Sequence, residues 1–382
     1  MSENLAELKR LIPSSPAFVL DEAQVLANLQ PLLALRQATD CKILYSMKAL
    51  PLASLLVLLF GRVDGISVSS LFEARLAKEV LGESGSSIHL TTPGMRPDEF
   101  PELGQLCSHI SFNSLSQYQR LHGLAGAYSK GLRVNPKLSF ANDQRYDPCR
   151  PHSKLGVDIE LLQDGLPAGV EGLHFHTVFA CLDFAPLQQT LEKLLPILKR
   201  SQLKWLNLGG GYLYHGIADQ AQVVELIQRL RVEFGIDIYL EPGKALVGNA
   251  GYIVTTVLDR FVSDGKQMLI LDTSVNHHPE VFEYQRKPRL LEEDDAGERT
   301  AILAGSTCLA GDVFGEYRFE QIPEVGEKLV FADVGAYSLI KANRFNGYNL
   351  PDVYALKQAQ ASLLKHYEFA DYRRQWLNDG TY

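Results

Sequence analysis

Short apolar runs alternate with longer amphipathic stretches along the first two thirds of the chain. Runs such as KILYS, GISVS and WLNL have the length and composition of strands, while PLQQTLEKLLPILKR and AQVVELIQRLRVEF place apolar residues at helical spacing. This alternation is typical of a parallel sheet covered by helices. About eight strand-like runs lie between residues 17 and 250. We therefore predict an α/β fold built on a closed TIM-type (β/α)8 barrel, which usually takes about 250 residues.

The pattern changes after residue 250. GYIVTTVLDRFV, QMLILDTSV, TAILAG and EKLVFADVGAYSLI are strand-like runs without long helices between them, and residues 288–300 form an acidic segment typical of a surface loop or hairpin turn. We expect two domains: a barrel over residues 17–250, and a second, mainly β C-terminal domain over residues 251–382 that also includes residues 1–16.

Composition excludes several classes of partner. The 382 residues include 37 basic and 45 acidic side chains, a net charge of −8, so no general attraction to nucleic acid or to an anionic membrane is expected. A cationic substrate meets a mildly favourable field. The length exceeds what one hydrophobic core usually spans, which also favours two domains.

Features of targeting and metal binding are not evident in the sequence. The N-terminus lacks a basic region followed by an apolar run and a cleavage site, and the apolar run at 50–60 is too short to span a bilayer. The five cysteines are widely separated, with neither CxxC pairs nor zinc spacing. We expect a protein of the reducing cytoplasm, with no membrane partner and no metal.

Lys48 ends the strand-like run KILYSMK, just before a helix-like segment. Chemistry in a barrel of this kind lies at the C-terminal ends of the strands. A partly desolvated lysine amine there loses affinity for its proton and can form a Schiff base. Taken alone, a surface lysine at a strand end is the better interpretation.

Two turns follow predicted strands in the same way. Gly209, Gly210 and Gly211 follow WLNL, where backbone amides can close on an anion, although a flexible turn gives the same pattern. Glu241 begins EPG after IYL, where a carboxylate facing a pyridine nitrogen would keep that nitrogen protonated. An ordinary turn or helix-capping acid is the alternative for Glu241.

Two histidines alternate in GLHFHT and therefore share one face of a strand. Either His174 or His176 could stack on a cofactor ring. A zinc pair is the sharper alternative, but neither an HExxH motif nor a nearby third ligand supports it. A buried core histidine is a further alternative for His174.

The C-terminal third contains three more candidates. STCLAGDVFGEY includes Cys308 and Asp312, and DVGAYSLIKANRFNGYN includes Tyr337. A thiol can donate a proton to a carbanion, a carboxylate can bind a substrate ammonium, and a phenol can bind phosphate. A core cysteine, a turn aspartate and a strand tyrosine are the simpler interpretations.

In chain order, these motifs resemble the fold type III decarboxylases that use pyridoxal phosphate (PLP), a group with an alanine racemase-like fold that includes ornithine, arginine and diaminopimelate decarboxylases. The resemblance spans PAFVLD, YSMKA, HFHT, GGGY, EPG, CLAGD and GAYS followed by FNG. Within the group, YDPCRPHSKLG and LDTSVNHHPEVFEYQ are most similar to carboxynorspermidine (carboxyspermidine) decarboxylases. The resemblance implies PLP as cofactor and a homodimer whose active sites are completed across the interface.

The resemblance also implies a role for each candidate. Lys48 would bind PLP, His176 would stack on its ring, and Glu241 would pair with the pyridinium nitrogen. Gly209, Gly210, Gly211 and Tyr337 would bind the phosphate. Cys308 of the partner subunit would donate a proton, while Asp312 of the partner subunit would contact the substrate amine. Asp272, in LDTSVNHH, is a second candidate for a substrate amine. Glu241, Asp272 and Asp312 form the expected substrate-binding set.

Two departures from the family pattern bear on the substrate. Relatives acting on basic amino acids read HxGS and EPGR where this chain reads HTVF, ending at Phe179, and EPGK, ending at Lys244. We therefore expect decarboxylation of carboxynorspermidine to norspermidine, or of carboxyspermidine to spermidine, rather than of ornithine or diaminopimelate. The alternatives are another carboxylated diamine, such as a siderophore precursor, and a non-catalytic PLP-binding protein. A racemase is less favoured, because it needs a base on each side of the substrate, and the CLAGD segment contains no tyrosine that could be one of them.

Overall fold

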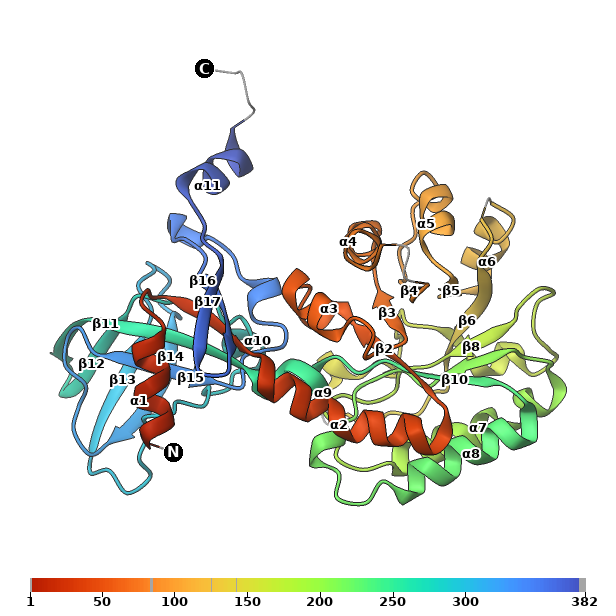
Figure 1. Ribbon diagram of the computed structural model, residues 1–382, viewed down its shortest axis with the longest axis horizontal. Helices are drawn as coiled ribbons and strands as arrows, with labels where there is room; N and C mark the ends of the chain where they lie inside the picture. The colour runs from red at the N-terminus through yellow and green to blue at the C-terminus, as the bar shows by residue number, and fades with distance from the viewer. Residues whose placement is uncertain (1, 83–84, 125, 142, 378–382) are drawn as a thin grey trace. The chain divides into compact units, whose positions relative to one another are not determined.

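A computed structural model describes residues 2–82, 85–124, 126–141 and 143–377 (Figure 1). The chain divides into two compact units. We call Asn28–Leu246 the barrel unit, and Met1–Ala27 together with Val247–Tyr382 the β unit.

The barrel unit contains a closed ring of parallel strands. In order around the ring these are β5 (His109–Phe112), β4 (Ser87–Thr91), β3 (Gly65–Val68), β2 (Lys42–Ser46), β10 (Asp237–Leu240), β9 (Trp205–Asn207), β8 (Gly172–His174) and β6 (Ser129–Asn135), with β7 (Val157–Asp158) beside β6. Pairing of β5 with β6 closes the ring. The predicted (β/α)8 barrel is confirmed.

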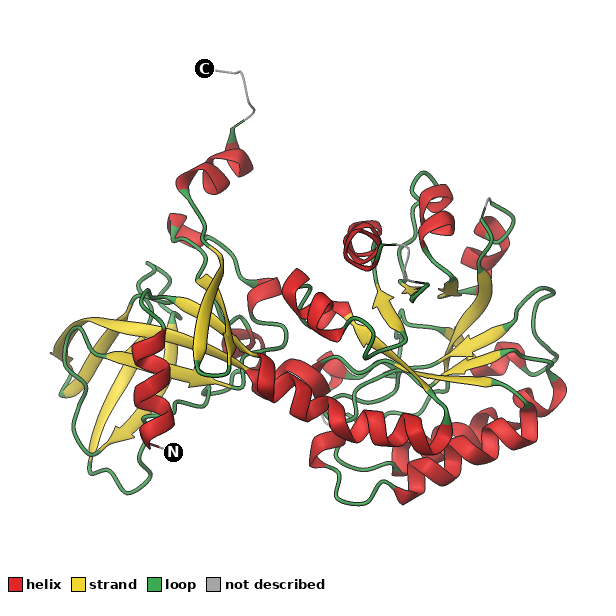
Figure 2. Ribbon diagram, viewed as in Figure 1, coloured by secondary structure: helices red, strands yellow, loops and turns green. Residues whose placement is uncertain are grey.

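Helices cover the outside of the ring, as Figure 2 shows. They are α2 (Glu22–Thr39), α3 (Ala53–Leu59), α4 (Leu71–Leu81), α5 (Phe100–Leu106), α6 (Leu115–Leu121), α7 (Ala185–Arg200) and α8 (Ala221–Phe234). In α7, apolar residues at helical spacing are buried while its lysines face away, and each buried leucine contributes about 1.5–3 kcal/mol. The apolar run at 50–60 forms α3, with Leu55 and Leu59 buried and Val57 exposed. Among the described helices, none is long and apolar enough to cross a membrane.

Aromatic rings fill the barrel near the start of its strands. Trp205 is buried against the rings of His109 and Tyr239. Gly131 and Gly172 make room for it, because a Cβ at either position would overlap the indole. Glycine inside a strand often marks such a close approach.

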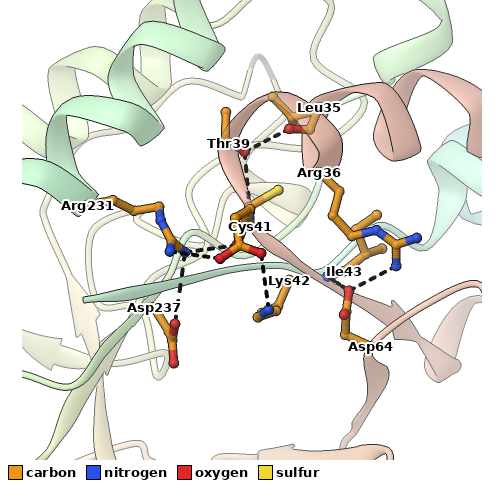
Figure 3. A network of polar contacts seen from close by, with 10 residues as sticks. Leu35, Arg36, Thr39, Cys41, Lys42, Ile43, Asp64, Arg231 and Asp237 are labelled. Carbon is orange, nitrogen blue, oxygen red and sulfur yellow. Dashed lines mark hydrogen bonds and ion pairs between the residues drawn. The ribbon is translucent and has the colours of Figure 1, made fainter. Parts of the chain in front are cut away.

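Polar contacts fix the point where the chain enters β2 (Figure 3). Arg231 of α8 donates to the carbonyl and the carboxylate of Asp40 at 2.8 Å each, and Asp64 accepts from the Ile43 amide at 2.8 Å. Exposed ion pairs of this kind are worth at most about 1 kcal/mol. They lie at the start of β2, whose other end leads to Lys48.

The β unit is mainly sheet, as predicted. The strand order is β14 (Val313–Phe319), β13 (Arg299–Ala304), β12 (Lys266–Leu271), β11 (Gly251–Ser263), β1 (Ala17–Asp21), β16 (Asp352–Lys357) and β17 (Gln360–Lys365), and β15 (Lys328–Ala332) also pairs with β11. Its helices are α1 (Ser2–Leu11), α10 (Glu280–Tyr284) and α11 (Phe369–Trp376), and the short α9 (Lys244–Val247) lies at the boundary between the units.

The first predicted strand lies in the β unit and not in the barrel. β1 pairs antiparallel with β11 and parallel with β16, and its AFVL residues are all buried. An uninterrupted apolar run suits a central strand of either domain, so the pattern could not distinguish them. The observed boundaries, after Ala27 and after Leu246, therefore differ from those expected at residues 17 and 250.

Candidate active site

Four neighbouring strands place their predicted site residues at the same end of the barrel. Lys48 lies in the turn η1 (Met47–Ala49) just after β2, and Glu241 directly follows β10. The glycine run begins two residues after β9, and His176 lies two residues after β8. Because these strands are parallel and adjacent, their carboxyl ends meet at one edge.

Lys48 combines solvent access with a desolvated amine. Its side chain is accessible to solvent, but the protein atoms packed around the amine displace much of its hydration and lower its pKa. Glu241 opposes that shift and Arg133 adds to it. A lysine with a lowered pKa is a better nucleophile at neutral pH. Gly243 lets the EPG turn pack on the lysine turn, since a Cβ there would lie 3.1 Å from Ser46 Cβ.

Glu241 is a buried carboxylate with both oxygens in polar contact. Asn207 Nδ2 donates to Oε1 at 2.9 Å, and His174 Nε2 lies 3.3 Å from Oε2. Burial by itself raises the pKa of Glu241, but His174, Lys48 and Asn207 together lower that pKa well below its usual range. The carboxylate is therefore ionised at neutral pH, as a partner for a protonated ring nitrogen must be.

The glycine run packs tightly on its neighbours. Gly209 and Gly211 have φ of +69° and +99°, and a Cβ on any of the three glycines would overlap a backbone carbonyl oxygen. Gly209 donates its amide to Asn207 Oδ1 at 2.9 Å, and Gly210 donates to His176 Nδ1 at 3.2 Å. Two of the three amides expected to face an anion are thus engaged inside the barrel, which leaves the Gly211 amide for that purpose.

The two histidines of GLHFHT have different surroundings. His174 is buried, whereas His176 is partly accessible and accepts the Gly210 amide at Nδ1. Burial, and then Lys48, lower the pKa of His176 well below its usual value, so its ring is neutral. In the part of the chain that the structure describes, no group of three histidine, cysteine or acidic side chains is arranged to bind a metal.

Three polar residues near Lys48 were missed by the sequence analysis. Arg133 of β6 is buried, and burial lowers its pKa while Glu241 raises it. Glu73 of α4 accepts the Ser69 amide at 2.6 Å; burial raises its pKa, and that amide and then Lys48 oppose the shift. Asn207 ends β9. Arg133 and Asn207 interrupt apolar strands, and that interruption was the available signal.

The two departures from the family pattern contact each other. Lys244 Nζ lies 5.4 Å from the ring centroid of Phe179. The ring of Tyr146 stacks on the ring of Phe179, and the two centroids are 5.3 Å apart. A cation over an aromatic ring is stabilised by about 0.5–2 kcal/mol. An aromatic ring with a lysine thus occupies the positions where relatives have a serine and an arginine.

The β unit contains the other four candidates. Asp312 is buried and accepts from Val275 N at 2.8 Å and from Ser274 Oγ at 2.9 Å. Asp272 accepts from Thr255 Oγ1 at 2.6 Å and from Ser15 Oγ at 2.5 Å. Both carboxylates thus connect segments of the β unit, which favours structural roles. Their contact with substrate remains a prediction.

Cys308 and Tyr337 lie in irregular segments of the β unit. Cys308 is exposed, and its amide donates to Asn346 Oδ1 at 2.8 Å. Tyr337 adopts a left-handed φ of +62°, and burial, together with Glu280, raises its pKa to about 12. Its phenol is therefore a neutral hydrogen-bond donor at neutral pH.

Comparison with known proteins agrees with this arrangement. The family model described as "Pyridoxal-dependent decarboxylase, C-terminal sheet domain" matches residues 17–335. The chain belongs to the pyridoxal-dependent decarboxylases. Their cofactor, pyridoxal phosphate, suits the residues present: an amine of lowered pKa at Lys48, an ionised buried carboxylate at Glu241, and a neutral imidazole at His176.

Relatives within this decarboxylase family align over nearly the whole chain. A carboxynorspermidine/carboxyspermidine decarboxylase of Campylobacter jejuni is 31% identical, with 94% of this chain and 97% of the relative covered. A carboxyaminopropylagmatine decarboxylase of Synechocystis is 33% identical, with 97% and 98% covered. The crystal structure of carboxynorspermidine decarboxylase with norspermidine, also from Campylobacter jejuni, superposes with a TM-score of 0.85 at 28% identity over 95% of this chain and 100% of that one.

Proposed function

We propose that this decarboxylase acts in polyamine biosynthesis, converting carboxynorspermidine to norspermidine, carboxyspermidine to spermidine, or both. Support comes from relatives of that activity that align from end to end. The observation on which the proposal depends is the pair formed by Lys48, whose pKa is lowered, and the ionised Glu241, at the carboxyl ends of adjacent strands.

The barrel residues have distinct tasks in this proposal. When bound, pyridoxal phosphate supplies a sink for the electron pair released as CO2 leaves. Lys48 Nζ would provide the covalent attachment, and Glu241 would hold the proton on the ring nitrogen. His176 would cover one face of the ring, and the Gly211 amide would bind the phosphate. Tyr337, in the β unit, is the further phosphate-binding residue that the family resemblance implies.

A head-to-tail homodimer in the cytoplasm would complete the site. Cys308 of the partner subunit would return a proton from Sγ to the substrate α-carbon, and Asp312 of the partner subunit would contact the substrate ammonium. The exposure of Cys308 supports this role, because a buried thiol could not meet a substrate. Each substrate ammonium that loses water on binding needs an anionic partner.

A second candidate substrate is carboxyaminopropylagmatine. It is favoured by the Synechocystis relative, which matches 97% of this chain at 33% identity. That substrate ends in a guanidinium and not an amine, and a planar five-donor group needs a different set of acceptors.

A CO2-release panel tests the proposal. The panel contains carboxynorspermidine, carboxyspermidine, carboxyaminopropylagmatine, ornithine, lysine and diaminopimelate. We expect the highest kcat/KM with one of the first two. A preference for the third would replace the proposed substrate, and silence on all six would favour the non-catalytic or siderophore-precursor alternatives.

A further inference from the structure

We propose that His174 is a positioning residue that fixes Glu241 in its ionised form and orientation for the ring nitrogen of the cofactor. The proposal rests on the proposed function, because it assigns Glu241 to that nitrogen. For His174, the sequence alone left a buried core histidine as an alternative interpretation.

The geometry places His174 beside Glu241. His174 ends β8 and is 2% exposed, and its Nε2 lies 3.3 Å from Glu241 Oε2. Asn207, at the same level of the next strand, binds the other oxygen at 2.9 Å. The two side chains thus approach the carboxylate from two adjacent strands, one at each oxygen.

The imidazole of His174 is otherwise without an aligned partner. Within the described part of the chain, neither ring nitrogen makes a hydrogen bond of good geometry, although the whole side chain is buried. A buried polar group without a hydrogen bond is rare in folded proteins and often has a functional role. Catalytic hydrogen bonds are often long or misaligned until the site is loaded, which fits the 3.3 Å contact.

The surrounding charges determine how the pair ionises. Burial lowers the pKa of His174, while Glu241 raises it and Arg133 and Lys48 lower it. His174 is therefore neutral at pH 7 and offers an N–H rather than a positive charge. The pair bears one negative charge, located on Glu241. On the side of β4, the neighbouring His89 is held neutral by its own burial and then by His109.

Removing the donor should change the protonation of Glu241. A buried carboxylate that loses a hydrogen bond is destabilised relative to its neutral acid. A Glu241 carboxylate that His174 no longer orients should meet the ring nitrogen less well, so the reaction should slow while substrate binding is retained. This pattern separates positioning from a packing role, which would affect stability only.

The experiment compares His174→Phe, which keeps the ring size, with His174→Gln, which keeps an N–H donor. His109→Phe is the matched control, since His109 is a barrel histidine that stacks on His89, packs against Tyr239 and has a pKa that responds to Glu171 and Asp237. Infrared spectra of the full-length protein without cofactor measure the band of the protonated Glu241 carboxyl. That band is assigned because it is absent from the spectrum of Glu241→Gln. Cofactor absorbance against pH, kcat and KM are then measured on the loaded enzyme.

We expect the apparent pKa of Glu241 to rise by about one unit or more in His174→Phe, and kcat to fall about tenfold with KM nearly unchanged. His174→Gln should recover most of both effects, and His109→Phe should show neither. Equal carboxyl titration in wild type and His174→Phe would overturn the positioning role. The carboxyl titration needs neither cofactor nor substrate. Its outcome is therefore independent of whether the CO2-release panel supports the proposed function. If His174→Phe does not fold, the same titration is measured on His174→Asn, whose shorter side chain does not reach Glu241, and an unchanged Glu241 titration in that variant would overturn the proposal.

Discussion

At the scale of single residues, the site depends on groups whose ionisation is set by their surroundings. Lys48 and Glu241 each shift the other's pKa, and both lie where burial alone would favour their neutral forms. Predictions at this scale therefore replace one group and keep its neighbours.

Lys48→Ala should remove the visible absorbance of the attached cofactor and lower kcat/KM by at least about a thousandfold, since the variant lacks the amine proposed to form the covalent link. Lys42→Ala is the matched control, because Lys42 begins the strand that leads to Lys48 and pairs with Asp40 at the opposite end of β2. Absorbance spectra and CO2 release measure both variants. Full activity in Lys48→Ala would contradict the assignment.

Phe179 and Lys244 should be energetically coupled in cofactor affinity. Phe179→Ser removes the ring and Lys244→Met removes the cation, so each change alone disrupts the contact and should weaken cofactor binding. The double variant should bind more tightly than the sum of single effects predicts, with a coupling of about 0.5–2 kcal/mol. Fluorescence titration with pyridoxal phosphate gives the four affinities, and strict additivity would show that the contact is irrelevant to binding.

At the scale of elements, short side-chain contacts join segments that the hydrophobic pattern treats as separate. Asp272 follows β12, and its carboxylate connects that strand to Thr255 and Thr256 of β11 and to Ser15 before β1. Glycines do the same for the loops after β8, β9 and β10, because each allows backbone to approach backbone.

Asp272→Ala should lower the free energy of unfolding of the β unit by about 1–3 kcal/mol, since Thr255, Thr256 and Ser15 lose a shared acceptor. Asp272→Asn, which keeps an acceptor oxygen, should lose less. Urea unfolding measures stability, and KM for carboxynorspermidine tests the substrate-binding role predicted from sequence. A KM increase in a variant of unchanged stability would favour that role over the structural one.

At the scale of the whole molecule, both units contain buried histidines that respond to acid. Burial lowers the pKa of His109 in the barrel unit and of His277 in the β unit to about 4. Unfolded chains bind this proton near about pH 6.5. Between these values the unfolded state binds more protons, so stability is fully present above about pH 6.5 and falls as the pH drops toward 4.

Thermal unfolding at a series of pH values should therefore show a lower midpoint at pH 5 than at pH 7. His109→Phe should flatten that dependence, whereas His215→Gln, at an exposed position, should leave it unchanged. Parallel curves for wild type and His109→Phe would show that this imidazole does not contribute.

Shared active sites make a prediction for mixed dimers. Lys48→Ala and Cys308→Ala should each be inactive or slow, but a mixture allowed to exchange subunits should recover up to about a quarter of wild-type activity. One of the two sites in each mixed dimer then has both residues intact, and random exchange makes half of the dimers mixed. CO2 release after exchange measures the recovery, and no recovery despite mixed dimers would place both residues in one subunit's site.

The sequence by itself determined the fold class and the end of the barrel at which the candidate residues lie. Strand–helix alternation predicted the barrel, and the positions of Lys48, the glycine run and Glu241 after apolar runs predicted that they meet at one end of it. These predictions succeeded because the periodicity of apolar residues, and the place of each residue relative to the end of its apolar run, are local properties of the chain. The family resemblance then predicted the cofactor.

Tertiary structure alone decided which strand belongs to which unit and how the charges are balanced. β1 joins β11 and β16, a pairing across more than two hundred residues that its apolar run could not specify. The contact of His174 with Glu241, and of Lys244 with Phe179, likewise depends on strands and loops packing side by side. Distances between groups far apart in the chain set their pKa values and contacts, and such distances arise only when the whole barrel closes.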